Sequence, residues 1–206
     1  DGYHGFSSRP WVREYSEFAG KKEMNSCKPW HLWKNRAPAP KKSMELHSMI
    51  QFLLQEQWNS IRRLCKKNGI KVLGDLPIYA AQDSSDVYFN RDIFSVTPTG
   101  KPVWLAGVPP DYFSATGQLW GNPVYRWGKS LETGHQWWTE RMRRALELFD
   151  MVRIDHFRGF ESFWRVPAGS ENAISGEWKK GPGYAFFNLL EQRLGRLPVV
   201  AEDLGM

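Results

Sequence analysis

The feature that most constrains the fold is a unit that occurs three times along the chain. Each unit joins a helical pattern, a short glycine-containing or polar turn, and an apolar segment that ends in a carboxylate. The predicted helices cover residues 43–68, 134–149 and 184–194, and the predicted strands cover residues 70–78, 151–156 and 197–204. Helices that alternate with apolar strands are typical of an α/β protein with a parallel sheet. Before the first unit, residues 1–42 lack clean periodicity and predict only one short helix around Trp11.

The first helix has the clearest pattern. Ser43 is its expected N-cap, and Asn68-Gly69 supplies a left-handed stop. Spacings of three and four predict one buried face, formed by Leu46, Met49, Ile50, Leu53, Leu54, Trp58, Ile61, Leu64 and Cys65. The strand that follows is expected to be buried on both sides. In the second helix the expected inward residues are Trp138, Met142, Ala145, Leu146 and Phe149.

Carboxylates stand near the expected carboxyl ends of all three strands, at Asp75, Asp155 and Glu202. Barrels and doubly wound α/β folds both carry their chemistry at these ends. Three strands cannot close a barrel of eight. The chain therefore predicts either a small open sheet or a partial (β/α)8 TIM barrel, and its end directly after the third strand favours the partial barrel.

The middle strand begins with apolar residues and then presents several charged groups. Arg153 lies two residues before Asp155 and so projects from the same face of the strand. A neighbouring guanidinium favours the ionised carboxylate, although a purely structural ion pair has the same pattern. Glu202 follows an apolar segment, which favours the protonated form. Two carboxyl groups with different pKa values match a retaining glycosidic mechanism, in which one attacks carbon and the other protonates the leaving oxygen.

Residues 79–130 form a long stretch rich in turns, aromatic side chains and amides, which we interpret as a loop-rich substrate-binding insertion. The chain contains 11 Trp, 12 Phe and 7 Tyr, and many of them fall in such loops. Aromatic rings held by loops suit sugar rings or bases, while most of the others must fill the core. Residues 167–183 are expected to be a polar, glycine-rich connection.

The composition argues against several other classes. The net charge is +6, but the basic residues are dispersed in short clusters, which argues against nucleic-acid binding. No apolar run approaches the roughly 18 residues of a membrane helix. Cys27 and Cys65 match no metal or redox spacing and favour a reducing, cytosolic setting. The histidines other than His156 show no metal spacing, so we expect neither a metal nor another cofactor.

Five motifs together resemble the 4-α-glucanotransferases, the amylomaltases or disproportionating enzymes of glycoside hydrolase family 77. They are GDLPI (74–78), GVPPDYFSATGQLWGNPVYRW (107–127), RIDHFRGF (153–160), KGPG (180–183) and AEDLG (201–205), with QFLLQEQW (51–58) in addition. The resemblance runs nearly the whole length of the chain. It implies a (β/α)8 barrel with inserted subdomains and transfer of α-1,4-glucan segments to the 4-hydroxyl of an acceptor such as glucose.

The resemblance also implies individual roles. Asp155 resembles the nucleophile, Arg153 the residue that orients it, and Glu202 the general acid/base. The substrate-contacting positions that it implies are Asp75, His156, Asp111, Tyr112, Phe113, Ser114, Gln118, Trp120 and Asn122. Of these, residues 111–114 resemble a flexible loop that closes over the donor.

The family is about twice as long as this chain, and its third catalytic carboxylate lies on a later strand. We therefore expect residues 1–206 to be a fragment of one catalytic domain, incomplete at both ends and inactive or poorly folded alone. An α-amylase-like hydrolase and a non-catalytic α-glucan-binding module are the alternatives. For a plant or algal source, a plastid is the alternative location. The sequence does not predict the oligomeric state.

Overall fold

The computed structural model describes residues 2–202, and the chain divides into two compact units. The first unit runs up to Ile70 and includes Asp83–Phe89. The second unit comprises Lys71–Gln82 and the chain from Asn90 onward. The three predicted strands lie in the second unit, apart from Ile70, which belongs to the first, and residues 203–204, which lie outside the described residues.

The first unit is helical. Its elements are α1 (Gly2–Ser7), α2 (Pro10–Met24), the 3-10 helix η1 (Trp30–Leu32), α3 (Lys41–Lys67) and α4 (Ser85–Phe89). Helix α2 packs against α3, where the buried hydroxyls of Ser16 and Ser48 lie 2.9 Å apart. The 15 residues of α2 exceed the short helix that we expected in this region.

Helix α3 has nearly the predicted bounds, and Asn68 and Gly69 end it as expected, with Gly69 at a φ of +69°. The expected Ser43 cap is wrong, because the helix begins at Lys41 and the Ser43 hydroxyl donates to Glu23 at 2.5 Å. The predicted burial is also wrong, since α1 and α2 pack elsewhere on the helix and Ser48 is its buried residue. The predicted face is exposed by between 39% and 61% at Leu46, Met49, Ile50, Leu53, Leu54, Ile61 and Leu64.

The second unit contains the predicted parallel sheet. Its strands are β1 (Leu73–Leu76), β4 (Met151–Ile154) and β7 (Val199–Ala201), in the order β1-β4-β7. The register places Asp75 opposite Arg153 and Ile154 opposite Ala201. Burial of β1 on both sides is wrong, since Leu73 is 55% exposed whereas Gly74 and Leu76 are buried.

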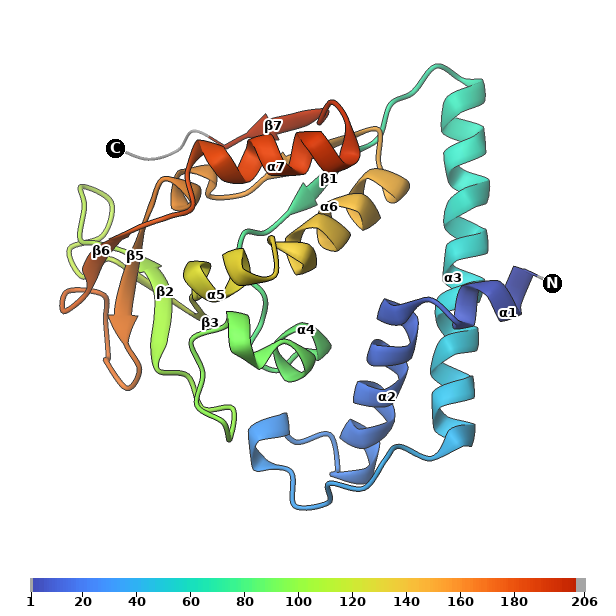
Figure 1. Cartoon of the computed structure of the whole chain (residues 1–206), viewed down its shortest axis with the longest axis horizontal. Coiled ribbons are helices and arrows are strands. Elements are labelled where there is room, and N and C mark those ends of the chain that lie inside the picture. Colours follow the sequence, from blue (N-terminus) through green and yellow to red (C-terminus); the bar gives the residue numbers. More distant parts are fainter. Residues whose placement is uncertain (1, 203–206) are drawn as a thin grey trace. The chain divides into compact units, whose positions relative to one another are not determined.

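Two helices accompany this sheet. Helix α6 (Gln136–Leu148) packs against β1 and β4, and α7 (Tyr184–Leu194) packs against α6 (Figure 1). Trp138, Met142 and Ala145 are buried as predicted. The chain thus alternates helix and strand at these places, which confirms the α/β class.

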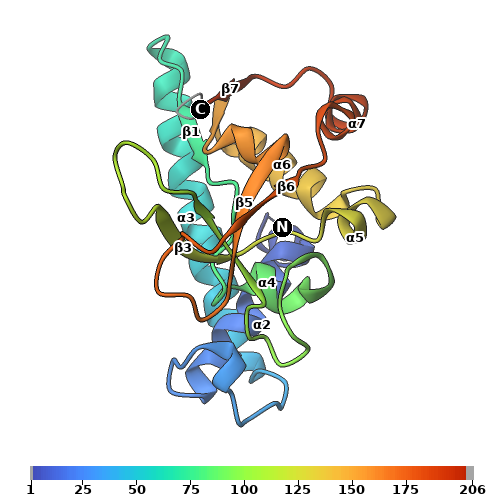
Figure 2. The same cartoon turned by 90° about the vertical axis from the view of Figure 1, so that its left-hand side faces the viewer.

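A second sheet has four antiparallel strands in the order β3-β2-β5-β6. Strands β2 (Trp104–Val108) and β3 (Gln118–Pro123) come from the predicted insertion, whereas β5 (Ser162–Pro167) and β6 (Glu177–Lys180) follow the parallel strand β4. Strand β5 lies between β2 and β6 (Figure 2). The short elements η2 (Arg91–Ile93), α5 (Trp127–Glu132) and η3 (Phe157–Phe160) complete the unit. Residues 167–183 are therefore more ordered than the expected polar connection.

Candidate active site

One guanidinium bridges three carboxylates at the end of the parallel sheet. Arg153 Nη1 lies 2.7 Å from Asp75 Oδ1, and Arg153 Nη2 lies 3.0 Å from Asp155 Oδ1 and 3.5 Å from Glu202 Oε2. The parallel ladder continues beyond the strands, because Asp155 N donates to Leu76 O and Glu202 N donates to Ile154 O, both at 3.1 Å. This ladder brings the three carboxylates, one from each strand, to the same arginine.

Asp155 and Glu202 form an interacting pair. Burial raises the pKa of the Asp155 carboxyl, the hydrogen bond and negative charge of Glu202 raise it further, and Arg153 opposes both. Arg153 thus favours the ionised carboxylate as expected from the sequence, but burial and Glu202 outweigh it and the net shift of the Asp155 pKa is upward. A second carboxylate close by disfavours the ionised form of the first, because two negative charges repel. The pKa of Asp155 therefore depends on Glu202, which comes from the neighbouring strand.

His156 connects this pair to the second sheet. Its backbone is left-handed, with φ 50° and ψ 49°, and its N–H donates to Glu202 Oε2. Its ring stands edge-on to Trp120, with centroids 4.9 Å apart. Burial lowers the pKa of the imidazole, with Asp155 opposing and Arg158 adding to the effect. Nε2 is buried and has no hydrogen-bond partner among residues 2–202, so this ring can donate to or accept from an entering hydroxyl.

The three predicted positions on β3 differ in their availability. Trp120 is 37% exposed and donates from Nε1 to Gln118 Oε1 at 3.1 Å. Asn122 donates from Nδ2 to Ala80 O at 3.0 Å and so joins β3 to the segment after β1. Trp120 therefore lies next to His156 and is held by Gln118, while the Asn122 amide donates to the backbone.

Residues 111–114 form a separate tight turn. Asp111 Oδ1 accepts from Phe113 N at 2.9 Å and Ser114 N at 2.8 Å, and Ser114 Oγ donates to Gly117 O at 2.8 Å. The turn holds Tyr112 and Phe113 in solvent, 96% and 91% exposed. Within the described part of the chain, these hydrogen bonds and ring contacts stay inside the turn and do not reach Arg153.

The sequence did not predict a group of hydrogen bonds and ring contacts that hold the segment after β1. Tyr125 Oη donates to Ile78 O at 2.6 Å, and Arg141 Nη1 donates to the same carbonyl at 3.1 Å. The buried Tyr79 stacks on Tyr125 at 5.8 Å and approaches Trp120 at 6.2 Å. Burial raises the pKa of the Tyr79 phenol, which therefore stays neutral. The only sequence signal was the position of Tyr79 directly after the first strand and of Tyr125 at the end of the insertion.

The described residues include no group of three or more His, Cys, Asp or Glu side chains arranged to hold a metal ion. Among residues 2–202, no helix has the length and apolar character needed to cross a bilayer. The polar site is thus built from hydrogen-bonding and ionisable side chains at strand ends. Such a site defines the class of α/β proteins that use the carboxyl ends of parallel strands.

Comparison with known proteins identifies the family. The family model for 4-alpha-glucanotransferase, glycoside hydrolase family 77, matches residues 3–206. This chain belongs to that family.

The chain is similar to several 4-alpha-glucanotransferases. The protein of Streptococcus pneumoniae serotype 4 is 41% identical to it over 211 residues, which cover 96% of this chain and 42% of the relative. The protein of Synechocystis is 46% identical over 210 residues, covering 95% and 42%. The chloroplastic/amyloplastic 4-alpha-glucanotransferase DPE1 of Oryza sativa subsp. japonica is 41% identical over 220 residues, covering 99% and 37%. The chain thus spans less than half the length of these relatives.

A solved structure supports the same assignment. The amylomaltase from Streptococcus agalactiae in complex with acarbose superposes with a TM-score of 0.93 at 32% identity, covering 99% of this chain and 44% of that one. The amylomaltase from Corynebacterium glutamicum superposes with a TM-score of 0.82 at 18% identity, covering 100% and 29%, which is a likeness of fold. Together these matches confirm the family resemblance drawn from the sequence motifs.

Proposed function

We propose that this chain carries part of the active site of a 4-α-glucanotransferase that moves α-1,4-glucan segments between maltooligosaccharides. The single observation that carries the proposal is the contact of Arg153 with the three carboxylates Asp75, Asp155 and Glu202. Each carboxylate comes from a different parallel strand, in a chain whose family members carry this activity. The remaining substrate positions are Asp111, Tyr112, Phe113, Ser114, Gln118, Trp120 and Asn122.

In the proposed first step Asp155 attacks the anomeric carbon of the donor and a covalent glycosyl–enzyme bond forms. The glycosidic C–O bond breaks, and Glu202 transfers its proton to the leaving oxygen. In the second step Glu202 takes the proton from the 4-hydroxyl of the acceptor, whose oxygen attacks the anomeric carbon and displaces Asp155. Two inversions retain the α configuration.

The two carboxyl groups of this mechanism meet at one arginine. Retaining chemistry needs carboxyl groups about 5–5.5 Å apart, and Asp155 and Glu202 both contact Arg153 Nη2, at 3.0 and 3.5 Å. His156 Nε2 and the exposed carboxylate of Asp75, whose side chain is 60% exposed, are the groups that we assign to the hydroxyls of the donor sugar ring.

We infer that transfer, and not hydrolysis, is the main reaction of the whole protein. In the family-based proposal, residues 111–114 close over the donor with Tyr112 and Phe113 and exclude water. Tyr112 and Phe113 are almost fully exposed, so the proposed closure requires the turn to move. We place the activity in a reducing compartment, cytosolic or plastid, because Cys27 and Cys65 are both free thiols.

We further propose that residues 1–206 alone are inactive, because the family's third catalytic carboxylate lies outside them. The test is to incubate maltotriose with this chain and with a version extended to the length of its relatives. Two maltotriose molecules should give glucose and maltopentaose with the extended form only, without an increase in reducing ends. An increase in reducing ends would instead indicate an α-amylase-like hydrolase.

The roles are tested by Asp155→Asn in the extended form, which should abolish transfer. Asp92→Asn is the matched control, because Asp92 is an exposed carboxylate on η2 of the same unit. Retained transfer in Asp155→Asn would refute the nucleophile assignment. If no form produces sugars but the chain still binds amylose, a non-catalytic α-glucan-binding module becomes the better description.

A further inference from the structure

Trp178 is a half-exposed tryptophan on β6, the edge strand of the antiparallel sheet. Its side chain is 40% exposed, and Arg158 Cζ lies 4.1 Å from the centroid of its ring. The guanidinium covers one face of the indole. The exposed area therefore belongs mainly to the other face and the ring edge.

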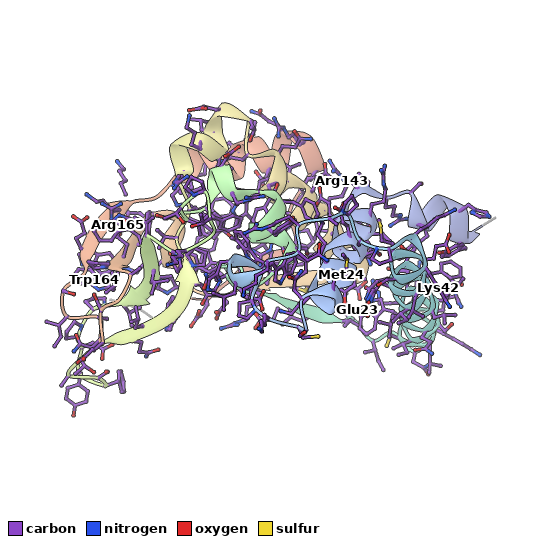
Figure 3. The ribbon with its side chains drawn as sticks, turned by 90° about the horizontal axis from the view of Figure 1, so that it is seen from below. Glu23, Met24, Lys42, Arg143, Trp164 and Arg165 are labelled. Atoms are coloured by element: carbon purple, nitrogen blue, oxygen red, sulfur yellow. The ribbon has the colours of Figure 1, made fainter. Side chains whose placement is uncertain are left out.

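The plane of Trp178 is held by its neighbour on β5. Trp164 lies directly opposite Trp178 in the register, and the two rings meet edge-on at 5.4 Å (Trp164 is labelled in Figure 3). Trp164 is itself held, since Nε1 donates to Ala173 O at 2.9 Å. The backbone at Gly176 also packs directly against this ring, because a Cβ at Gly176 would lie 2.2 Å from Trp164 Nε1. Trp178 is thus a pre-oriented flat surface.

Arg158 supplies unused donors at the rim of this surface. Its guanidinium makes no hydrogen bond or ion pair with any residue between Gly2 and Glu202. Arg165 provides a contrast on the same sheet: it lies 3.9 Å over Trp104, but its Nε and Nη2 donate to Glu177 at 3.0 and 2.6 Å. A guanidinium that lies flat on a ring directs its N–H groups outward in the ring plane. The N–H groups of Arg158 are therefore available to a ligand that contacts Trp178.

The surface is separate from the site beside His156. Trp164 lies opposite Gly107 on β2, and Gly107 lies opposite Leu119 on β3. Side chains alternate between the two faces of a strand. Trp164 and Trp178 therefore share the face of Leu119. Within residues 2–202 the ring of Trp178 contacts Trp164 and Arg158, whereas the ring of Trp120 contacts His156.

We propose that Trp178 and Arg158 form a second saccharide-binding site, which takes a glucose unit of an α-glucan chain. The apolar C–H face of a pyranose stacks on the indole, and the hydroxyls at its edge accept from the Arg158 N–H groups. The choice of glucose rests on the proposed transferase function. The site would hold a long glucan on the protein without occupying the carboxylate cluster.

The test is a calorimetric titration of the chain with maltoheptaose. Trp178→Ala should weaken binding by about tenfold, the upper range of ring-stacking effects. Trp178→Phe keeps a flat ring and should retain most of the affinity. Tyr184→Ala is the matched control, because it removes a 79% exposed aromatic ring from α7 in the same unit and should change nothing. Circular dichroism of each variant checks that it is folded.

Equal affinity in the wild type and in Trp178→Ala would overturn this site, as would a loss that Trp178→Phe shares in full. Preferential binding of a single-stranded oligonucleotide at Trp178 would also overturn it. Maltotriose transfer by the extended form tests the catalytic proposal separately. If Trp178→Ala transfers normally and also binds maltoheptaose normally, only the proposal of a second site is refuted. If Trp178→Ala loses maltoheptaose binding but no form of the protein transfers glucan, only the catalytic proposal is refuted.

Discussion

The ring of Phe149 lies directly on the backbone of Gly74. A Cβ built at Gly74 would be 2.1 Å from Phe149 Cδ2, so no other residue type fits without moving the ring. Gly74 immediately precedes Asp75 on β1, and Phe149 ends α6 just before β4. This contact therefore sets the spacing between the helix and the strands that carry Asp75 and Arg153.

Gly74→Ala should destabilise the chain by roughly 1–3 kcal/mol, because overpacking forces the Phe149 ring or the backbone of β1 to shift. Gly128→Ala is the matched control: Gly128 lies in α5, and a Cβ there would meet nothing within 4 Å. That change should be neutral or stabilising by up to about 1 kcal/mol, through helix propensity. Urea unfolding of both variants measures the difference, and equal midpoints would contradict the packing argument.

Glu202→Gln should lower the pKa of Asp155. Glu202 raises that pKa through its hydrogen bond and its negative charge, and the amide removes the charge while it can donate to an ionised carboxylate. Arg153→Gln should have the opposite effect, since Arg153 is the group that lowers this pKa. Carbon-13 NMR titration of the Asp155 carboxyl distinguishes the two. Shifts in the same direction for both variants would contradict the pair described here.

The free energy of unfolding should fall as the pH drops below about 6.5. His135 is buried, with Nδ1 2.7 Å from the Ser130 hydroxyl, and burial followed by the charge of Arg193 lowers its pKa from the ordinary value of 6.5. Folding therefore favours the neutral imidazole. Its contribution is complete above 6.5 and is lost as the pH falls through the lowered pKa, because the unfolded chain then binds more protons.

His135→Asn should reduce this pH dependence, since asparagine tolerates the left-handed backbone at φ 53° and does not titrate. Some dependence should remain, because burial also lowers the pKa of His156. Unfolding midpoints of the wild type and of His135→Asn at pH 7.5 and 5.5 give the pH dependence of stability for each protein. A slope unchanged in His135→Asn would assign the effect to other groups.

The three helix–strand units were predictable because their information is local. Apolar periodicity and the Asn68-Gly69 stop specified α3, and the charged end of β4 indicated where a polar site would form. The predicted grouping of Asp75, Asp155 and Glu202 followed from one rule, that the carboxyl ends of parallel strands meet at one edge of a sheet.

Other features depended on contacts that no local pattern contains. Strands β5 and β6 are short, and their charged side chains fall on both faces of the pair while both tryptophans share one face, so the strands show no simple apolar–polar alternation. The pKa of Asp155 depends on Glu202, which is 47 positions away in the chain and meets it only through the sheet. The apolar face of α3 shows that periodicity predicts a helix more surely than it predicts which neighbour covers that helix.

The order of the strands has a consequence for how the chain folds. In the antiparallel sheet, β2 and β3 precede the parallel strand β4 in the sequence, whereas β5 and β6 follow it. Each sheet is therefore interrupted in sequence by strands of the other. Pairing of Trp104 with Pro167 closes a long loop, and such non-local contacts slow folding. During synthesis one edge of β2 stays unpaired until β5 has been made. Unpaired strand edges promote association between chains. Neither sheet can be excised as a continuous peptide, so the two must be completed together.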